Sequence, residues 1–115
     1  MATAENIGTN TRPAVLWEGI TQSDTCDEFF LPGGDYIAEV TGDFSGSAVI
    51  QLEWGSQSGT TTAYDTDEAP DGAKFSAAGV VKIRIADGYH KPTITGGDGS
   101  TDVDVRIKPI YYKGI

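Results

Sequence analysis

The chain has 115 residues, of which 38% are hydrophobic, and its formal net charge is −9. This length supports one domain with a modest core, and the acidic charge disfavours nucleic-acid binding, which needs clustered Lys and Arg to neutralise phosphates. The single cysteine, Cys26, excludes an intramolecular disulfide and a thiolate zinc cluster.

The first twelve residues are rich in Thr, Asn and Ala, and Pro13 ends this stretch. We expect a flexible N-terminal arm at 1–12 and a folded domain at 13–115. The arm has two open interpretations: a disordered tail, or a segment that orders only on a neighbouring molecule. It lacks a basic stretch followed by an apolar run, and no stretch reaches the roughly 20 apolar residues of a membrane span. We therefore expect a protein made in a cytoplasm, without a membrane partner.

From residue 14 onward the hydrophobic pattern has a period near two and is broken by Gly, Asp, Ser or Pro about every eight to twelve residues, as in sandwiches and barrels. The 15 glycines disfavour helices. We therefore predict an all-β chain, a single antiparallel β-sandwich of jelly-roll or immunoglobulin-like type with about eight strands. The expected strands are 14–20, 27–31, 35–41, 47–54, 60–64, 73–77, 80–86, 89–95 and 101–110.

Three of these segments alternate strongly, so their two faces can be assigned. The residues predicted to face the core are Ala48, Ile50, Leu52, Trp54, Val81, Ile83, Ile85, Val103, Val105 and Ile107. The opposite face carries Lys82, Arg84, Asp102, Asp104, Arg106 and Lys108. These charged rows favour either cross-strand ion pairs or a contact between copies of the chain, and the sequence leaves both open.

Two stretches resemble each other, "LPGGDYIAEVTG" at 31–42 and "IADGYHKPTITGG" at 85–97. In each, a strand end meets a glycine turn and a tyrosine follows, Tyr36 in the first and Tyr89 in the second. We predict two sandwich corners, each with a buried tyrosine ring whose hydroxyl bonds the nearby backbone. Pro92 cannot donate to a β-ladder, so it predicts that 89–95 lies at a sheet edge or carries a bulge.

Residues that could carry chemistry are few. Cys26 and His90 are the only cysteine and histidine, and nothing in their spacing links them, so Cys26 is interpreted as a buried or boundary residue. The acidic loop 65–72, "DTDEAPDG", resembles the start of a calcium loop but lacks the glycine and glutamate that complete it, which favours a solvated loop. Asp98, Asp102 and Asp104 lie near another turn, and there too a solvated loop is favoured over a calcium site. We predict no catalytic residue, no metal and no cofactor, and hence a protein that is not an enzyme.

The aromatic residues leave two options. Trp17 and Trp54 fit core positions, whereas a row of exposed aromatics would favour a carbohydrate-binding module of sandwich fold. Tyr64, Tyr111 and Tyr112 are more plausible at the surface, and the terminal "IYYKGI" could close the last strand or dock on another subunit. The candidate partner contacts are Ile7, Arg12, Tyr64, Lys82, Arg84, Tyr111 and Tyr112.

The strings "FFLPGGDYIAEVTGDFSGSAVIQLEW", "KFSAAGVVKIRIADGYHKPTITGG" and "VDVRIKPI" together resemble small β-sandwich virion proteins of tailed bacteriophages. The shared pattern is Leu-Pro-Gly-Gly-x-Tyr, a strand ending in Trp, the "ADGYHKPTITGG" corner and a final alternating strand, and it covers 29–110.

This resemblance implies a structural role without catalysis: a capsid decoration or cement protein that binds the major capsid protein at capsomer junctions, often as a homotrimer. It places the protein on the virion surface after synthesis in the host cytoplasm. The alternatives are a tail- or fibre-associated structural protein and a carbohydrate-binding module.

Overall fold

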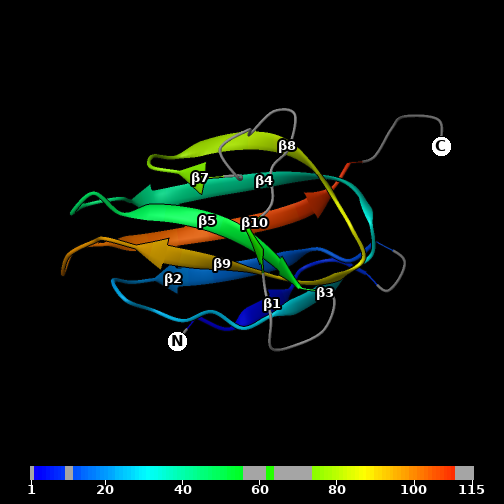
Figure 1. Ribbon diagram of the computed structural model, residues 1–115, viewed down its shortest axis with the longest axis horizontal. Helices are drawn as coiled ribbons and strands as arrows, with labels where there is room; N and C mark the ends of the chain where they lie inside the picture. The colour runs from blue at the N-terminus through cyan, green and yellow to red at the C-terminus, as the bar shows by residue number, and fades with distance from the viewer. Residues whose placement is uncertain (1, 10–11, 56–61, 64–73, 111–115) are drawn as a thin grey trace.

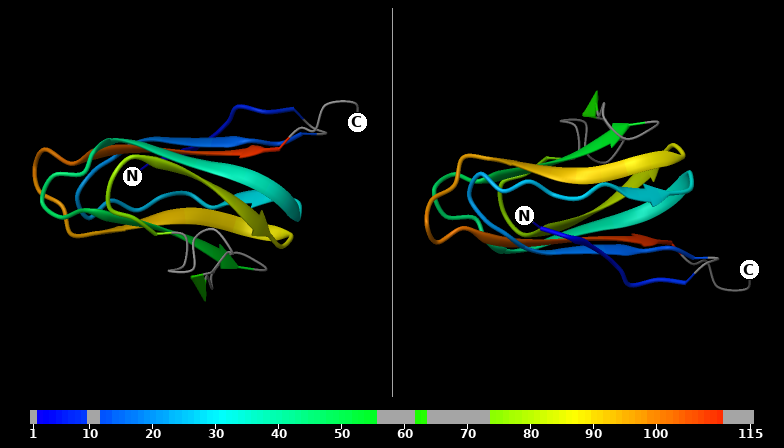
Figure 2. Two further views of the ribbon diagram at one scale, coloured as in Figure 1. Left: turned by 90° about the horizontal axis from the view of Figure 1, so that it is seen from above. Right: turned by 90° about the horizontal axis from the view of Figure 1, so that it is seen from below.

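A computed structural model describes residues 2–9, 12–55, 62–63 and 74–110, with the backbone alone at 54–55 and 62–63. The described chain forms two antiparallel sheets that pack face to face, which confirms the predicted β-sandwich (Figures 1 and 2). Its strands are β1 (Ala4–Asn6), β2 (Val15–Ile20), β3 (Phe29–Leu31), β4 (Gly34–Asp43), β5 (Val49–Gly55), β6 (Thr62–Ala63), β7 (Lys74–Phe75), β8 (Gly79–Ile85), β9 (Gly88–Thr95) and β10 (Asp102–Pro109). The described residues thus contain ten strands, of which β6 and β7 have two residues each, where the sequence predicted about eight.

The strand order identifies the topology. Sheet I has the order β1-β2-β10-β4-β8, and sheet II has the order β3-β9-β5-β6, with β7 also paired to β5. Strands that follow one another in sequence mostly alternate between the sheets, and the first and last long strands, β2 and β10, are neighbours. This interleaving is that of a jelly roll and differs from the immunoglobulin arrangement.

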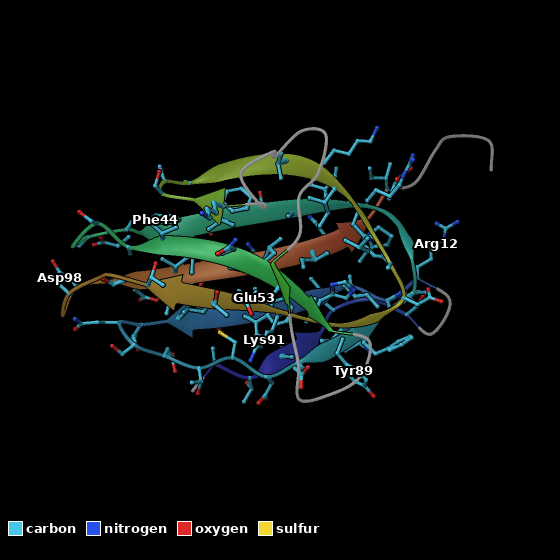
Figure 3. The ribbon with its side chains drawn as sticks, viewed as in Figure 1. Arg12, Phe44, Glu53, Tyr89, Lys91 and Asp98 are labelled. Atoms are coloured by element: carbon cyan, nitrogen blue, oxygen red, sulfur yellow. The ribbon has the colours of Figure 1, made fainter. Side chains whose placement is uncertain are left out.

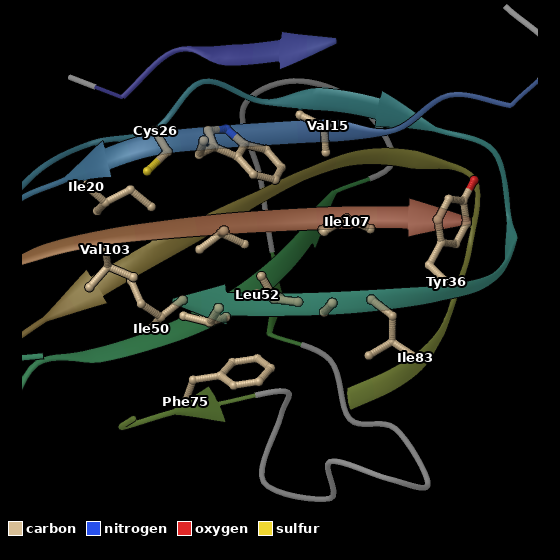
Figure 4. Packing of buried hydrophobic residues seen from close by; sticks show 14 of the residues in the cluster. Val15, Ile20, Cys26, Tyr36, Ile50, Leu52, Phe75, Ile83, Val103 and Ile107 are labelled. Carbon is tan, nitrogen blue, oxygen red and sulfur yellow. The ribbon is translucent and has the colours of Figure 1, made fainter. Parts of the chain in front are cut away.

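The core lies between the sheets and is built from the residues that alternation assigned to it (Figure 4). Ile50 and Leu52 from sheet II meet Ile83, Val103, Val105 and Ile107 from sheet I, and all are at most 1% exposed. Val81, on the edge strand β8, is half-buried and packs against the core. The side chain of Trp54 lies outside the described residues.

Strand β2 contains a β-bulge that the periodicity alone does not predict. Its pairing with β10 shifts register between Val103 and Val105, so that these residues oppose Ile20 and Trp17. Gly19 has φ of 72° and donates its backbone N–H to Asp104 Oδ1 at 2.9 Å. The extra residue turns both Trp17 and Ile20 toward the core, where each is fully buried.

The segment expected as a flexible arm, 1–12, differs from that expectation over its described part. β1 pairs with β2 at the edge of sheet I. Ala2, which is 3% exposed, donates its backbone N–H to Thr25 O and accepts the N–H of Asp27, so it lies beside Cys26. These backbone groups satisfy one another, so the segment forms part of the sandwich in this structure.

The two similar stretches form one continuous antiparallel ladder that crosses from one sheet to the other. β3 pairs with β9 in sheet II, with Leu31 opposite Gly88, and β4 pairs with β8 in sheet I, with Gly34 opposite Ile85. The register is the same on both sides of the crossing, so the corners lie directly against each other. Gly34 and Gly88 have φ of 147° and 149°, which glycine adopts without strain.

The prediction of a buried tyrosine is confirmed at the first corner and wrong at the second. Tyr36 is 3% exposed and donates its hydroxyl to Pro32 O at 2.7 Å. The equivalent residue in the second corner is His90, which is 1% exposed and bonds Ala86 O through Nε2 at 3.0 Å, again four residues upstream. Tyr89 follows its glycine by one position instead of two, so strand alternation places it on the outer face.

Pro92 is accommodated differently from the expectation. β9 lies between β3 and β5 and pairs in register with β5 from Tyr89 to Thr95, so the predicted edge position and bulge are wrong for the strand as a whole. However, β3 pairs only with Gly88, Tyr89 and His90. Pro92 therefore lies beyond the end of β3, where the proline ring interrupts no pairing with that strand.

The two corner tyrosines give a matched test. Tyr36→Phe should lower the free energy of unfolding by about 0.5–1.5 kcal/mol, because the Pro32 carbonyl loses its hydroxyl partner. Tyr89→Phe should change it by less than about 0.5 kcal/mol, since Tyr89 is half-buried on the outer face and its hydroxyl makes no hydrogen bond to the described residues. Urea denaturation of both variants checks this, and equal effects would contradict the assignment of the corner.

Candidate functional site

The predicted contact residues lie at two separate places. Lys82 and Arg84 are exposed on the outer face of β8, at one edge of sheet I. Ile7, which is 40% exposed, and the exposed Arg12 lie in the β1–β2 connection at the opposite edge of the same sheet. The structure therefore does not bring these two pairs into one site. Tyr64, Tyr111 and Tyr112 lie outside the described residues.

The outer face of sheet I carries the cross-strand ion pairs that alternation suggested. Arg84 Nε donates to Asp35 Oδ1 at 2.8 Å, and Arg106 Nη1 lies 3.6 Å from Glu39 Oε1, each directly across its strand pair. The hydrogen bond from Arg84 holds the pKa of Asp35 below its ordinary value. Because the Arg84 side chain remains 81% exposed, this pair contributes little to stability and leaves the guanidinium within reach of a partner.

The outer residues of β8 form what we name the cationic edge: Val80, Lys82 and Arg84. Val80 is 63% exposed, and both charged residues are exposed. No acidic residue occurs in β8, although the whole chain carries a net charge of −9. The cationic edge therefore combines two basic side chains with one exposed apolar side chain on a protein of net negative charge, and Asp35 of β4 lies beside Arg84 on the same face.

Sheet II exposes an aromatic pair that the sequence analysis missed. Phe30 is 50% exposed, and its ring packs edge to face against Tyr89 with centroids 5.6 Å apart. Lys91 and Glu53 lie opposite each other further along this face, and Thr93 donates its hydroxyl to Glu53 Oε2 at 2.9 Å (Figure 3). The sequence could have predicted an exposed aromatic residue here, because Phe29 and Phe30 are adjacent in one strand and must point to opposite faces.

Cys26 is buried, as predicted, and its surroundings make it a poor nucleophile. The side chain is 7% exposed and lies in the hydrophobic core (Figure 4). Ala2 belongs to the same cluster. Burial, with a smaller contribution from the Asp24 carboxylate, raises the pKa of the thiol to about 12. The reactive thiolate is therefore scarce at neutral pH.

His90 has a structural role at the corner. Its Nε2 faces the Ala86 carbonyl, which can only accept, so Nε2 carries the hydrogen. Burial lowers the pKa of the ring below its ordinary value of 6.5, and the bond to Ala86 opposes that shift only in part. The neutral imidazole is therefore the form that the fold accommodates.

Asp98, in the β9–β10 turn, and Asp104, in β10, both accept hydrogen bonds from backbone N–H groups. Asp98 Oδ1 accepts the N–H of Ser100, and Asp104 Oδ1 accepts the N–H of Gly19. Among the described residues, no group of three or more His, Cys, Asp or Glu is arranged to hold a metal ion. The loop 65–72, considered above for calcium, lies outside the described residues.

Comparison of the chain with protein-family models, with curated proteins and with solved structures gives no match. In the part of the chain that the structure describes, no helix has the length and apolar character to cross a membrane. The features that define the molecule are thus its jelly-roll fold and its two outer faces.

We predict that Cys26 is protected from thiol reagents by the N-terminal segment. At pH 9, where half of exposed thiols ionise, a pKa of about 12 leaves roughly one in a thousand as thiolate. Ala2→Glu should speed labelling by Ellman's reagent, because a charge at this buried position displaces the segment that covers Cys26. Thr3→Glu, at an exposed neighbour, is the control, and equal acceleration by both would contradict the prediction.

We also predict that stability falls in mild acid because of His90. Its pKa is lowered on folding, so its contribution is fully present above about pH 6.5 and is lost as the pH falls toward the folded-state value. The free energy of unfolding should decrease by up to about 1.4 kcal/mol per pH unit below that point. Urea denaturation between pH 8 and pH 5 measures the slope.

His90→Gln removes the only histidine and should flatten this slope, whatever its effect on stability at pH 8. The carboxylates with lowered pKa, those of Asp24, Asp35 and Asp43, titrate below 3.8 and do not enter this window. An unchanged slope in the variant would show that another group is responsible.

Proposed function

We propose that the protein is a non-enzymatic virion structural protein of a tailed bacteriophage, a capsid decoration protein that binds the major capsid protein and stabilises the head shell. The sequence resemblance over 29–110 supports this proposal, and jelly rolls are common in viral capsid proteins. Jelly rolls also occur in lectins, so the fold by itself does not decide the function. The surface features must therefore supply the rest.

The observation that carries the proposal is the cationic edge of Val80, Lys82 and Arg84. It is an exposed row on the outermost strand, which suits contact with another protein surface. A single row of this size contributes modest affinity, since exposed ion pairs yield about 1 kcal/mol or less. Repetition on a symmetric shell, with copies arranged as trimers, compensates through avidity. A tail- or fibre-associated position would use the same surface.

A second candidate, a carbohydrate-binding module, is favoured by one observation. Phe30 and Tyr89 present an exposed aromatic pair on sheet II, with the polar side chains of Thr93 and Glu53 on the same face. Against it, Trp17 is fully buried and donates Nε1–H to Asp27 O, so it cannot stack on a sugar. Among the described residues, the second candidate therefore depends on Phe30 and Tyr89 alone, without a tryptophan.

Co-sedimentation with expanded heads stripped of accessory proteins tests the proposal, using the phage that encodes the chain. We expect saturable binding at a copy number that matches capsid symmetry, and weaker binding at high salt. Lys82→Glu should reduce binding, whereas Phe30→Ala, on the other sheet, should leave it unchanged. Deleting residues 1–12 would be a poor test of whether this segment contacts the shell, because β1 and Ala2 form part of the fold and their loss would disturb it.

Two results would contradict the proposal. Absence of binding to heads, with binding to purified tails, would move the protein to the tail. Glycan binding that is lost in Phe30→Ala but kept in Lys82→Glu would establish the carbohydrate-binding alternative.

A further inference from the structure

Among the described residues, β8 is an edge strand of regular pairing. It is the last strand of sheet I, and the described residues provide no strand on its outer side. It pairs with β4 from Gly79 to Ile85 without a register shift. Strand edges of this kind present unpaired backbone N–H and C=O groups, and an additional strand can bind to them.

The side chains of β8 specify what such a strand would carry. Residues that lie opposite each other in a sheet share a face. An added strand would therefore place every second side chain beside Lys82 and Arg84 on the outer face. Carboxylates there complement Lys82 and approach Arg84 from the side opposite its partner Asp35 on β4. Its other side chains would lie beside Val81, Ile83 and Ile85 and extend the core, so they should be apolar.

Pairing of β8 with β8 of a second copy is unfavourable. The antiparallel register that pairs the whole strand sets Gly79 opposite Ile85 and therefore Lys82 opposite Lys82, with like charges in direct contact. Such like-charge pairs destabilise a sheet. The same cations that oppose self-pairing favour a partner of opposite charge.

We propose that the outer edge of β8, which no other described strand covers, binds an extended acidic segment of a partner protein as an additional antiparallel or parallel strand. The segment would alternate carboxylate and apolar side chains, and its backbone would bond the open edge. This binding mode goes beyond capsid decoration, and its test needs no capsid, so the two proposals can fail separately. The competing interpretation is that Lys82 only protects the edge against unwanted pairing.

The test uses a fluorescent seven-residue peptide of alternating glutamate and valine, matched to the length of β8, with the lysine–valine peptide as its counterpart. Fluorescence anisotropy with the full chain should show binding of the acidic peptide alone. Lys82→Glu should weaken this binding by at least about tenfold. Lys108→Glu makes the same charge change on the same face of β10, two strands or about 10 Å away, and should weaken it much less.

Two further peptides separate strand addition from charge attraction. One is N-methylated at its odd positions and the other at its even positions. Since only alternate N–H groups of an added strand face β8, one methylated peptide should lose binding and the other should retain it. Equal binding of both would overturn strand addition, and failure of the unmodified acidic peptide to bind would overturn the proposal and support edge protection. Circular dichroism of each variant confirms that it is folded.

Discussion

The sandwich depends on the ladder that joins residues 29–40 to residues 79–90 across both sheets. At the crossing the two backbones approach so closely that a Cβ on Gly33 would lie 3.2 Å from Asp87 N and from Ile85 O. Gly33 donates its N–H to Asp87 Oδ1, which fastens one corner to the other. Because Leu31 and Gly34 are paired on either side of this point, the corner fixes the register of four strands together. In a sheet, a slip of one residue would turn every core side chain outward.

The opposite end of the sandwich is closed by a second pair of turns. Gly97 donates its N–H to Gly46 O at 2.9 Å, and the buried hydroxyl of Thr101 donates to Ser45 O at 2.8 Å. A Cβ on Gly46 would lie 2.5 Å from the Gly97 carbonyl carbon, so the two turns meet without side chains between them. Both ends of the sandwich are thus held by close backbone contacts together with one side-chain bond each, from Asp87 and from Thr101.

The fold class and most of the core follow from the sequence because strand alternation is a local signal. The rows at 47–54 and 101–110 predicted which side chains are buried without any knowledge of the partner strands. Features that depend on non-local geometry could not be predicted in this way. The bulge at Gly19 is visible only once β10 is in place, and the equivalence of His90 with Tyr36 requires the register of the two corners. Matching Tyr89 to Tyr36 by residue type missed this, since one position along a strand exchanges its faces.

The predicted contact residues also combine a local feature that the sequence predicts with a non-local one that it does not. Alternation correctly placed Lys82 and Arg84 on an outer face, but only the strand order shows that they lie at an open edge, with Ile7 and Arg12 at the other edge of the sheet. This position gives the charge distribution a physical consequence. A chain of net charge −9 repels an acidic partner from most directions, and the cationic edge attracts it over about 8 Å at physiological salt. Repulsion by the acidic surfaces and attraction by the cationic edge are screened over the same distance, and together they favour encounters in which the proposed acidic segment arrives along β8.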